Sequence, residues 1–382
     1  MSALTGPVVG AARVLAVPDL GGAGLVSQQA DALPKGFPAK LDTKLAWVGS
    51  DFKDPETYVY QLTQSDLAEI SQAISHFKGL GLDGEHVSRN TFPLPQLGAK
   101  LDELSSEVHE GRGFCLVRGV NPADYSVGDL TLVYLGVQTY IADQRAHQDS
   151  RGNMLVHIIA DKSSKTSTEH HRHSNKSITF HTEETGDVVS WLTRNTASSG
   201  GRCIISSAHT VYNALAASRP DLVRLLARAD WPFVFPHFQC RPVIFHEGSR
   251  LIMNFGRTPL IGNSIHPRPA RLPSVTARQI EALDAIEAIA KAAQLEIRTQ
   301  AGDMHFINNL AILHRRESFK DGAEALEKRH LVRMRLRSTQ HGWTLPKELE
   351  TEWDNDFDED HRRVWHIEPM PESFYPLRKY PN

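Results

Sequence analysis

A histidine and a glutamate lie two positions apart at the end of an apolar, strand-like run, residues 178–183. In a β-strand, residues i and i+2 face the same side, so His181 and Glu183 would project an imidazole and a carboxylate together. Such a triplet is common by chance, and on its own it is typical of a solvated His/Glu pair. The pair gains meaning only from a further ligand elsewhere in the chain.

A second segment, residues 302–314, supplies that ligand. It is predicted to form a turn, a strand and an irregular bend at Asn308 and Asn309, and it ends at His314. Two imidazoles and one carboxylate on one face of a metal form the facial triad of non-haem iron(II) oxygenases, which leaves the other coordination positions open. The candidate catalytic residues and metal ligands are therefore His181, Glu183 and His314, and iron(II) is the metal that suits them.

Arginines alternate along a third segment, residues 328–337. A period of two places four of them on one face of the predicted strand: Arg329, Arg333, Arg335 and Arg337. An arginine fork binds a carboxylate through two parallel hydrogen bonds, as the far end of a metal-chelating dicarboxylate such as 2-oxoglutarate requires. Arg329 and Arg333 are the candidates for a cavity, whereas Arg335 and Arg337 are expected on a solvated basic face.

The chain has 19 histidines, and the densest group lies at residues 170–173. Short histidine-rich tracts can bind metal. This tract lies in a polar stretch, residues 162–176, that is predicted to be a loop, so we do not assign it to the metal. Eight further histidines lack a carboxylate partner at metal-ligand spacing and are predicted to be structural or at the surface: His237, His246, His266, His305, His330, His341, His361 and His366.

The secondary structure predicted around these residues changes from helices to strands along the chain. Apolar positions at helical spacing predict early helices, over residues 63–77, 95–109 and 126–141. After about residue 154 short β-like runs predominate, interrupted by two helical segments, residues 211–227 (broken at Pro220) and 276–295. This order predicts a mixed, mainly β fold, with a double-stranded β-helix (jelly roll) core flanked by α-helices.

Composition excludes several classes of protein. With 382 residues, 40% hydrophobic and 23% charged, the chain has a globular composition rather than a disordered or collagen-like one. A net charge of −3 argues against nucleic-acid binding. The three cysteines are far apart and predict reduced thiols in a cytoplasmic protein. No apolar run is long enough to cross a bilayer.

No internal repeat or long low-complexity linker divides the chain, so one catalytic unit is expected. Residues 61–340 are predicted to form a single jelly-roll domain with a helical lead-in. Residues 1–60 are predicted to be an N-terminal extension, because the start of the chain lacks the basic flank and compact apolar core of a signal peptide. Residues 341–382, with acidic and aromatic side chains, are predicted to be a tail that packs on the core.

In order and approximate spacing, these segments resemble the TauD/TfdA-like iron(II)/2-oxoglutarate-dependent dioxygenases, most closely the fungal members. The resemblance covers about residues 113–337 and includes Gly200-Gly201-Arg202-Cys203. It implies that the candidate triad binds iron(II), with 2-oxoglutarate and O₂ as cosubstrates. It also implies that Arg329 holds the distal carboxylate of 2-oxoglutarate and that Arg333 binds an acidic group of the substrate. Which of the two arginines clamps 2-oxoglutarate stays open.

Two positions depart from the usual pattern of that family. Most members have aspartate where this chain has Glu183, and glutamate is similar to the clavaminate-synthase-like branch, whose substrates are often amino acids. Cys203 stands where members usually carry a hydroxyl residue that helps to hold 2-oxoglutarate. A thiol is a weak hydrogen-bond donor, so Cys203 is a cofactor-binding candidate with a doubtful contact.

The expected function is that of a dioxygenase that oxidises an unactivated C–H bond of a small carboxylate or a free amino acid. 2-Oxoglutarate and O₂ would give succinate and CO₂, and the outcome would be hydroxylation, desaturation or cyclisation. The expected partner is a small molecule, not nucleic acid or a membrane, and the protein would be a monomer or a homodimer. The alternatives are a cupin-like metal-dependent hydrolase or isomerase that does not use 2-oxoglutarate, and a non-catalytic binding protein.

Overall fold

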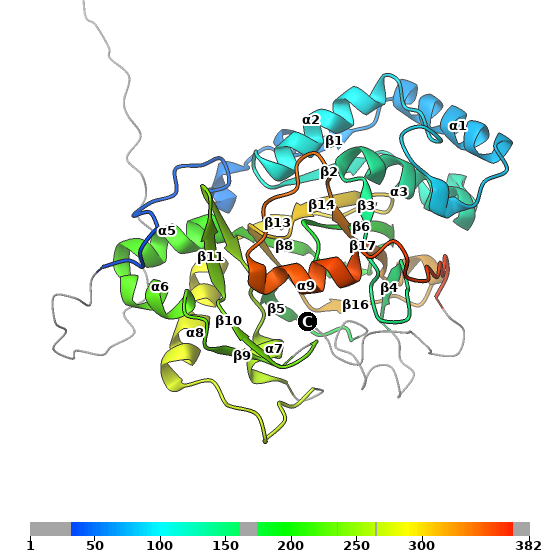
Figure 1. Ribbon diagram of the computed structural model, residues 1–382. Coiled ribbons are helices and arrows are strands. Elements are labelled where there is room, and N and C mark those ends of the chain that lie inside the picture. Colours follow the sequence, from blue (N-terminus) through cyan, green and yellow to red (C-terminus); the bar gives the residue numbers. More distant parts are fainter. Residues whose placement is uncertain (1–31, 161–173, 235, 264–265, 370–382) are drawn as a thin grey trace, which may run out of the picture.

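A computed structural model of the protein describes residues 32–160, 174–234, 236–263 and 266–369. Its centre is a pair of β-sheets (Figure 1). The larger sheet has the strand order β1-β2-β14-β6-β17-β3, with β4 also paired to β17. Its strands are β1 (Val59–Gln61), β2 (Phe114–Arg118), β3 (Gln144–Arg145), β4 (Val156–Ile159), β6 (Val188–Asn195), β14 (Met304–Asn308) and β17 (His330–Arg337).

The smaller sheet has the order β13-β8-β15-β5 and carries two of the predicted metal ligands. Its strands are β5 (Ile178–His181), β8 (Cys203–Ser207), β13 (Leu295–Ile297) and β15 (Ile312–Arg316). An apolar core joins the two sheets: Phe114 and Trp191 of the larger sheet belong to one buried cluster with Ile205 and Ile297 of the smaller one. His181 and His314 therefore belong to a two-layered framework with a shared core.

Helices cover the outer face of each sheet, as Figure 1 shows. The larger sheet packs against α1 (Gln64–Gly79), α2 (Leu97–His109) and α3 (Val127–Ile141). The smaller sheet packs against α5 (Ala208–Ser218), α6 (Pro220–Leu226) and α8 (Ala277–Ala293). This arrangement confirms the predicted class, a jelly-roll core flanked by α-helices.

Local sequence signals explain where these helices begin. At the start of α1 the hydroxyl of Thr63 accepts a hydrogen bond from the N–H of Asp66 at 3.2 Å, and the Asp66 carboxylate accepts one from the Thr63 N–H at 2.8 Å. This reciprocal capping box satisfies N–H groups that have no partner within the helix. Thr276 forms the same box at α8. Pro220 stands at the first position of α6, where its missing N–H costs nothing, and it separates α5 from α6.

The remaining elements are short. Three small antiparallel pairs are β7 (Ser199–Gly200) with β16 (Phe319–Lys320), β9 (Trp231–Phe233) with β10 (Gln239–Arg241), and β11 (Ile244–Glu247) with β12 (Arg250–Met253). Two further α-helices are α7 (Arg257–Ile261) and α9 (Lys347–Asp356). Single 3₁₀ turns lie at Gly49–Asp51, Pro55–Thr57, Gly84–His86, Pro122–Asp124 and Ala325–Glu327.

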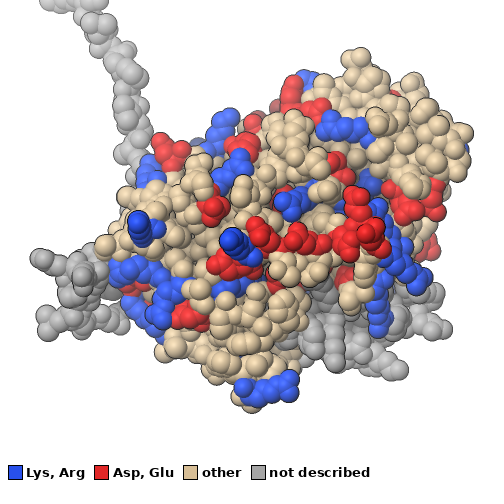
Figure 2. All heavy atoms as spheres, in the orientation of Figure 1, with Lys and Arg blue, Asp and Glu red and all other residues tan. Residues whose placement is uncertain are grey.

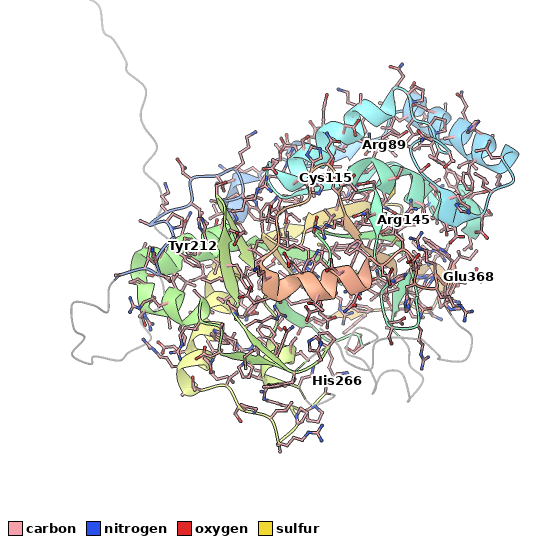
Figure 3. The ribbon with its side chains drawn as sticks, in the orientation of Figure 1. Arg89, Cys115, Arg145, Tyr212, His266 and Glu368 are labelled. Atoms are coloured by element: carbon pink, nitrogen blue, oxygen red, sulfur yellow. The ribbon has the colours of Figure 1, made fainter. Side chains whose placement is uncertain are left out.

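Of the first 60 residues, those from 32 onward are described, and several are part of the core. Leu45, Trp47 and Tyr58 are buried in the cluster between the sheets. β1 pairs in parallel with β2, so this stretch closes one edge of the larger sheet. At the opposite edge Arg145 of β3 lies beside α3 (Figure 3), where its guanidinium donates to Gln138 Oε1 at 3.1 Å and to the Leu135 carbonyl at 3.2 Å.

The C-terminal helix α9 lies across the front of the molecule in Figure 1, and Figure 2 shows a row of acidic side chains over it. Its inner side is apolar: Trp353 is fully buried, and its indole N–H donates to Asp187 Oδ1 at 3.0 Å. No helix in the part of the chain that the structure describes has the length and hydropathy to cross a membrane.

The prediction that Arg335 lies on a solvated face of β17 is wrong. Its side chain is 1% exposed, its Nη1 donates to Thr185 Oγ1 at 2.6 Å and its Nη2 lies 3.1 Å from Asp356 Oδ2. α9 brings Asp356 to this position, so the residue that pairs with Arg335 comes from the chain's C-terminal part. Arg337, two residues on, is partly exposed and lies 3.9 Å from Asp187 Oδ2.

Candidate metal centre

The three predicted ligands come together. His181, Glu183 and His314 each offer one ligand atom, and these atoms lie within 4.8 Å of one another. Nε2 of His314 lies 3.7 Å from Oε1 of Glu183, and the centroids of the two imidazole rings are 4.3 Å apart. In the described ranges this is the one group of three or more such side chains with metal-binding geometry.

Strand pairing, rather than alternation along one strand, brings the ligands together. β5 ends at His181, which lies directly opposite His314 in the antiparallel register of β5 and β15. Glu183 lies beyond the end of β5, in the connection to β6. The expected i, i+2 pair on a single strand is therefore replaced by a strand end and an adjoining loop, whose conformation must be fixed by other contacts.

Two sets of hydrogen bonds fix that loop. The N–H of Thr182 donates to the Phe255 carbonyl at 2.7 Å, and the Phe255 N–H donates to Thr182 Oγ1 at 3.0 Å. On the other side the N–H of Glu183 donates to Asn309 Oδ1 at 2.7 Å. The Asn309 amide nitrogen donates in turn to the carbonyl oxygens of Glu183 at 3.1 Å and Gly186 at 2.9 Å. The sequence marked Asn309 only as part of an irregular bend, so its role was missed.

The donor set fits iron(II). Nδ1 of His181 donates to the Thr179 carbonyl at 2.9 Å, which fixes the tautomer with its lone pair on Nε2. Nε2 of His314 points toward Glu183, as the distance above requires. Two neutral imidazole nitrogens and one carboxylate oxygen are the ligands of the facial triad, and they suit ferrous iron.

Arg333 lies against the carboxylate ligand. Its Nη1 forms an ion pair with Glu183 Oε1, and its Nη2 donates to Gln148 Oε1 at 3.3 Å. All three side chains are buried. The carboxylate that would bind the metal is thus oriented by a cation from β17, and Arg333 is confirmed to line the cavity.

Arg329, the residue immediately before β17, lines the same cavity. The cavity is lined by the candidate ligands and Cys203, by an apolar wall of Ile158, Ile178, Trp191 and Leu331, and by five arginines: Arg202, Arg315, Arg316, Arg329 and Arg333. In the described residues the guanidinium of Arg329 forms no ion pair with a carboxylate. Burial lowers the pKa of Arg329 to about 10, so it stays a cation at neutral pH.

Burial shifts the pKa of two further side chains in or next to this cavity, Cys203 and His305. The pKa of the Cys203 thiol is raised to about 12 by burial, so it stays protonated at neutral pH. His305 stacks on Trp191 with ring centroids 4.9 Å apart, and burial lowers the pKa of His305 to about 3. His305 therefore supports Trp191, which lines the cavity, as a neutral ring.

Sequence reasoning also missed Arg316, two residues after His314. Its side chain is buried, and its Nη2 donates to the carbonyl oxygens of Ser174 at 2.6 Å and Lys176 at 2.7 Å. These contacts hold the backbone that leads into β5. The histidine tract at residues 170–173 lies outside the described residues.

Two facing sheets, a two-histidine, one-carboxylate centre and an arginine-lined cavity define a jelly-roll metal-dependent oxygenase. The sequence profile of the taurine catabolism dioxygenase TauD, TfdA family matches residues 77–335. The chain belongs to this family. It is accordingly an iron(II)- and 2-oxoglutarate-dependent dioxygenase, as the resemblance in the sequence implied.

Relatives agree with this assignment. The chain is 33% identical over 345 residues to the taurine hydroxylase-like protein SAT17 of Stachybotrys chartarum, covering 87% of this chain and 89% of that protein. It is 24% identical over 321 residues to FR-33289 synthase of Streptomyces rubellomurinus, covering 80% and 92%.

Solved structures share the fold. Asparagine oxygenase, in complex with Fe(II), 2S,3S-3-hydroxyasparagine and succinate, matches with a TM-score of 0.59 at 16% identity, covering 75% of this chain and 99% of that one. The non-haem iron oxygenase OrfP, in complex with Fe, succinate and (3S)-hydroxy-L-Arg, matches with a TM-score of 0.55 at 13% identity, covering 73% and 94%.

Proposed function

We propose that His181, Glu183 and His314 hold iron(II) and that the protein hydroxylates a small amino-acid-like substrate. One oxygen atom of O₂ would enter succinate, formed from 2-oxoglutarate with loss of CO₂, and the other would enter the substrate C–H bond. The observation that carries this proposal is the convergence of the three ligand atoms within 4.8 Å at an arginine-lined cavity. Iron(II) would supply the oxygen activation, and the protein would supply binding and orientation.

Arg329 is the proposed clamp for the distal carboxylate of 2-oxoglutarate. Arg333 already uses Nη1 on Glu183 and Nη2 on Gln148. Arg329 pairs with no carboxylate in the described ranges, although it lines the same cavity as the metal ligands. A partly buried guanidinium that forms no ion pair is suited to an incoming carboxylate, which it can bind through two parallel hydrogen bonds.

Arg333 is the proposed binding group for an acidic substituent of the substrate, which would take the place of Gln148 at Nη2 while Nη1 keeps its ion pair with Glu183. It lies beside the metal-ligand carboxylate, so a group bound there would hold neighbouring carbon atoms near the metal. Asparagine oxygenase and OrfP are named with hydroxylated amino acids, and SAT17 is named as taurine hydroxylase-like. These names support an amino-acid-like or sulfonate-bearing substrate for this chain.

The apolar wall of the cavity would bind the carbon skeleton of the substrate. Ile158, Trp191 and Leu331 offer no hydrogen-bonding group to a substrate's carbon skeleton, apart from the indole N–H. They would exclude water from the C–H bond and would orient an aliphatic segment by packing. The arginines would then fix the two anionic ligands, and the apolar wall would fix the reacting carbon.

A turnover assay tests the proposal. The protein is supplied with iron(II), ascorbate and 2-oxoglutarate, and succinate is measured across a panel of amino acids and aminosulfonates. We expect succinate to rise with a subset of the panel, to be absent in His181→Ala, and to persist in His246→Ala, a histidine outside the metal centre. If succinate does not form with any compound and an oxoglutarate analogue does not stabilise the fold, the proposal is wrong.

We also propose a cytoplasmic protein that acts as a monomer or a homodimer. The three cysteines are free, and Cys115 and Cys203 are buried, which fits a compartment that keeps thiols reduced. Subcellular fractionation and the molar mass in solution test these two statements.

A further inference from the structure

The cavity at the metal centre continues past Arg329. A second cavity shares Trp191, Cys203, Arg329 and Leu331 with the first and extends between β6, β17 and the turn before β8. Arg329 lies where the two cavities meet. A carboxylate bound by Arg329 would therefore touch side chains of both.

Five hydroxyl side chains line this second cavity: Thr193, Thr196, Ser198, Ser199 and Thr299. Of these, Thr193 alone is buried, with 1% of its surface exposed, whereas the other four are partly or fully exposed. Oγ1 of Thr193 has no hydrogen-bond partner among the described residues. A buried hydroxyl without a partner is unfavourable, and it gains from any acceptor that enters the cavity.

The register of the sheet determines which face of the sheet the Thr193 side chain occupies. It lies opposite Leu331 in the antiparallel pairing of β6 and β17. Trp191 and Leu331 belong to the core cluster between the sheets, and side chains two apart on a strand share a face. Thr193 therefore faces the inter-sheet side, as do Trp191 and Leu331, and it does not face the helices.

The resemblance noted in the sequence implies a hydroxyl donor to 2-oxoglutarate at the position that Cys203 occupies. The thiol of Cys203 stays protonated because burial raises its pKa, and a thiol donates weak hydrogen bonds. The distal carboxylate of 2-oxoglutarate thus has Arg329 on one side and lacks a strong hydroxyl donor from β8.

We propose that Thr193, from β6, donates the hydroxyl hydrogen bond to the distal carboxylate of 2-oxoglutarate beside Arg329. It thereby takes over the contact that Cys203 makes poorly. This inference rests on the proposed function, since it needs 2-oxoglutarate as the ligand, and it assigns a binding role to a residue outside the sequence motifs.

Binding measured without turnover tests the inference. The protein is loaded with Mn(II), and calorimetry gives the Kd of 2-oxoglutarate and of 2-oxopentanoate, which lacks only the distal carboxylate. Thr193→Val keeps the shape of the side chain and removes the hydroxyl. We expect Thr193→Val to raise the Kd of 2-oxoglutarate roughly tenfold or more, as for a hydrogen bond to a charged group, and to leave that of 2-oxopentanoate unchanged.

Two further variants control the experiment. Thr131→Val removes a buried hydroxyl of α3 that donates to the Val127 carbonyl at 2.8 Å, away from the cavity, and is expected to bind both ligands as the unmodified protein does. Adding Cys203→Thr to Thr193→Val is expected to recover affinity for 2-oxoglutarate, because it returns a hydroxyl from β8. The melting temperature of each variant checks folding.

The outcomes separate the inference from the proposed function. If the unmodified protein loaded with Mn(II) does not bind 2-oxoglutarate, the proposed function fails. If it binds, and Thr193→Val weakens both ligands equally or neither of them, the inference about Thr193 is overturned and the proposed function stands.

Discussion

The side-chain amide of Asn309 holds the backbone of Glu183 on both sides. Oδ1 accepts the Glu183 N–H at 2.7 Å, and Nδ2 donates to the Glu183 carbonyl at 3.1 Å, although the residues are 126 positions apart. Asn309 lies in the bend between β14 and β15, and β15 carries His314. One amide therefore ties the Glu183 loop to the bend that leads into β15, the strand of His314.

We predict that Asn309→Ala weakens metal binding. Removing the amide frees the Glu183 loop, and loss of such supporting contacts typically costs roughly 10–100-fold in metal affinity. Titration with Mn(II), followed by calorimetry or by the shift in melting temperature, measures the change. The proposed role fails if the Mn(II) affinity of Asn309→Ala equals that of the unmodified protein.

Asn308→Ala is the matched control for that experiment. Asn308 is as buried as Asn309, but its Nδ2 donates to the Val108 carbonyl at 3.2 Å, on the side of α2. Both variants lose buried hydrogen bonds and should be destabilised. Only Asn309→Ala should also lose metal affinity.

Substitution of Arg329 and of Arg333 should change different kinetic constants, the KM for 2-oxoglutarate and the KM for the substrate. Arg329→Ala is expected to raise the KM for 2-oxoglutarate roughly 10–100-fold, since it removes a charged hydrogen-bond donor. Arg333→Ala is expected to raise the KM for the substrate and also to weaken Mn(II) binding, since it removes the cation that orients Glu183. Steady-state kinetics of succinate formation gives both constants, and the reverse pattern would assign the clamp to Arg333.

Two arginines of one strand should differ in their effect on folding. The guanidinium of Arg335 is buried and holds both Asp356 and Thr185, so Arg335→Ala removes two contacts from the interior and should cost about 3–5 kcal/mol. Arg337 is partly exposed and 3.9 Å from Asp187, whose buried carboxylate keeps the Trp353 N–H as a partner, so Arg337→Ala should cost less, about 1–3 kcal/mol. Urea denaturation compares the two, and equal costs would contradict the buried pair.

Stability should fall in acid. Burial lowers the pKa of His209 to about 4, below the ordinary value of 6.5 that it has in the unfolded chain. The unfolded state therefore binds a proton that the folded state refuses, and the stability due to this group is lost as pH falls from about 6.5 toward about 4. His109 and His157 act in the same direction.

The acid effect can be assigned to one histidine. Nδ1 of His209 is 3.0 Å from Thr43 Oγ1, and Nε2 is 3.2 Å from the Leu251 carbonyl, so glutamine can replace its polar atoms. Between pH 7.5 and 5.0, the loss of unfolding free energy should be smaller in His209→Gln by about 2 kcal/mol. His76→Gln, at an exposed site on α1, should keep the full loss; identical losses in both variants would refute the assignment.

Features that depend on nearby residues were predictable from the sequence. The capping box of Thr63 and the break at Pro220 act within a few residues, and the predicted helices begin and end close to them. The convergence of His181, Glu183 and His314 was also predictable, because metal chemistry restricts the residue types of a candidate centre. Their assembly, however, uses the pairing of His181 with His314 across β5 and β15, which no local pattern specifies.

Features that depend on distant parts of the chain were not predictable. Arg335 has the local pattern of an exposed strand residue, and only the placement of α9 buries it against Asp356. Asn309 and Thr193 look like ordinary polar residues in the sequence. Their roles follow from the Glu183 loop and from a cavity shared with Arg329, both of which are formed by long-range packing.

Because β5 is an edge strand, a bound metal would also stabilise the edge of the smaller sheet. β5 is the last strand of the smaller sheet and pairs only with β15 among the described strands. A metal held by His181 and His314 would bridge these two strands and cross-link the rim of the sheet. Fraying of that rim and release of the metal would then be one event, so amide hydrogen exchange along β5 would report the lifetime of the loaded centre.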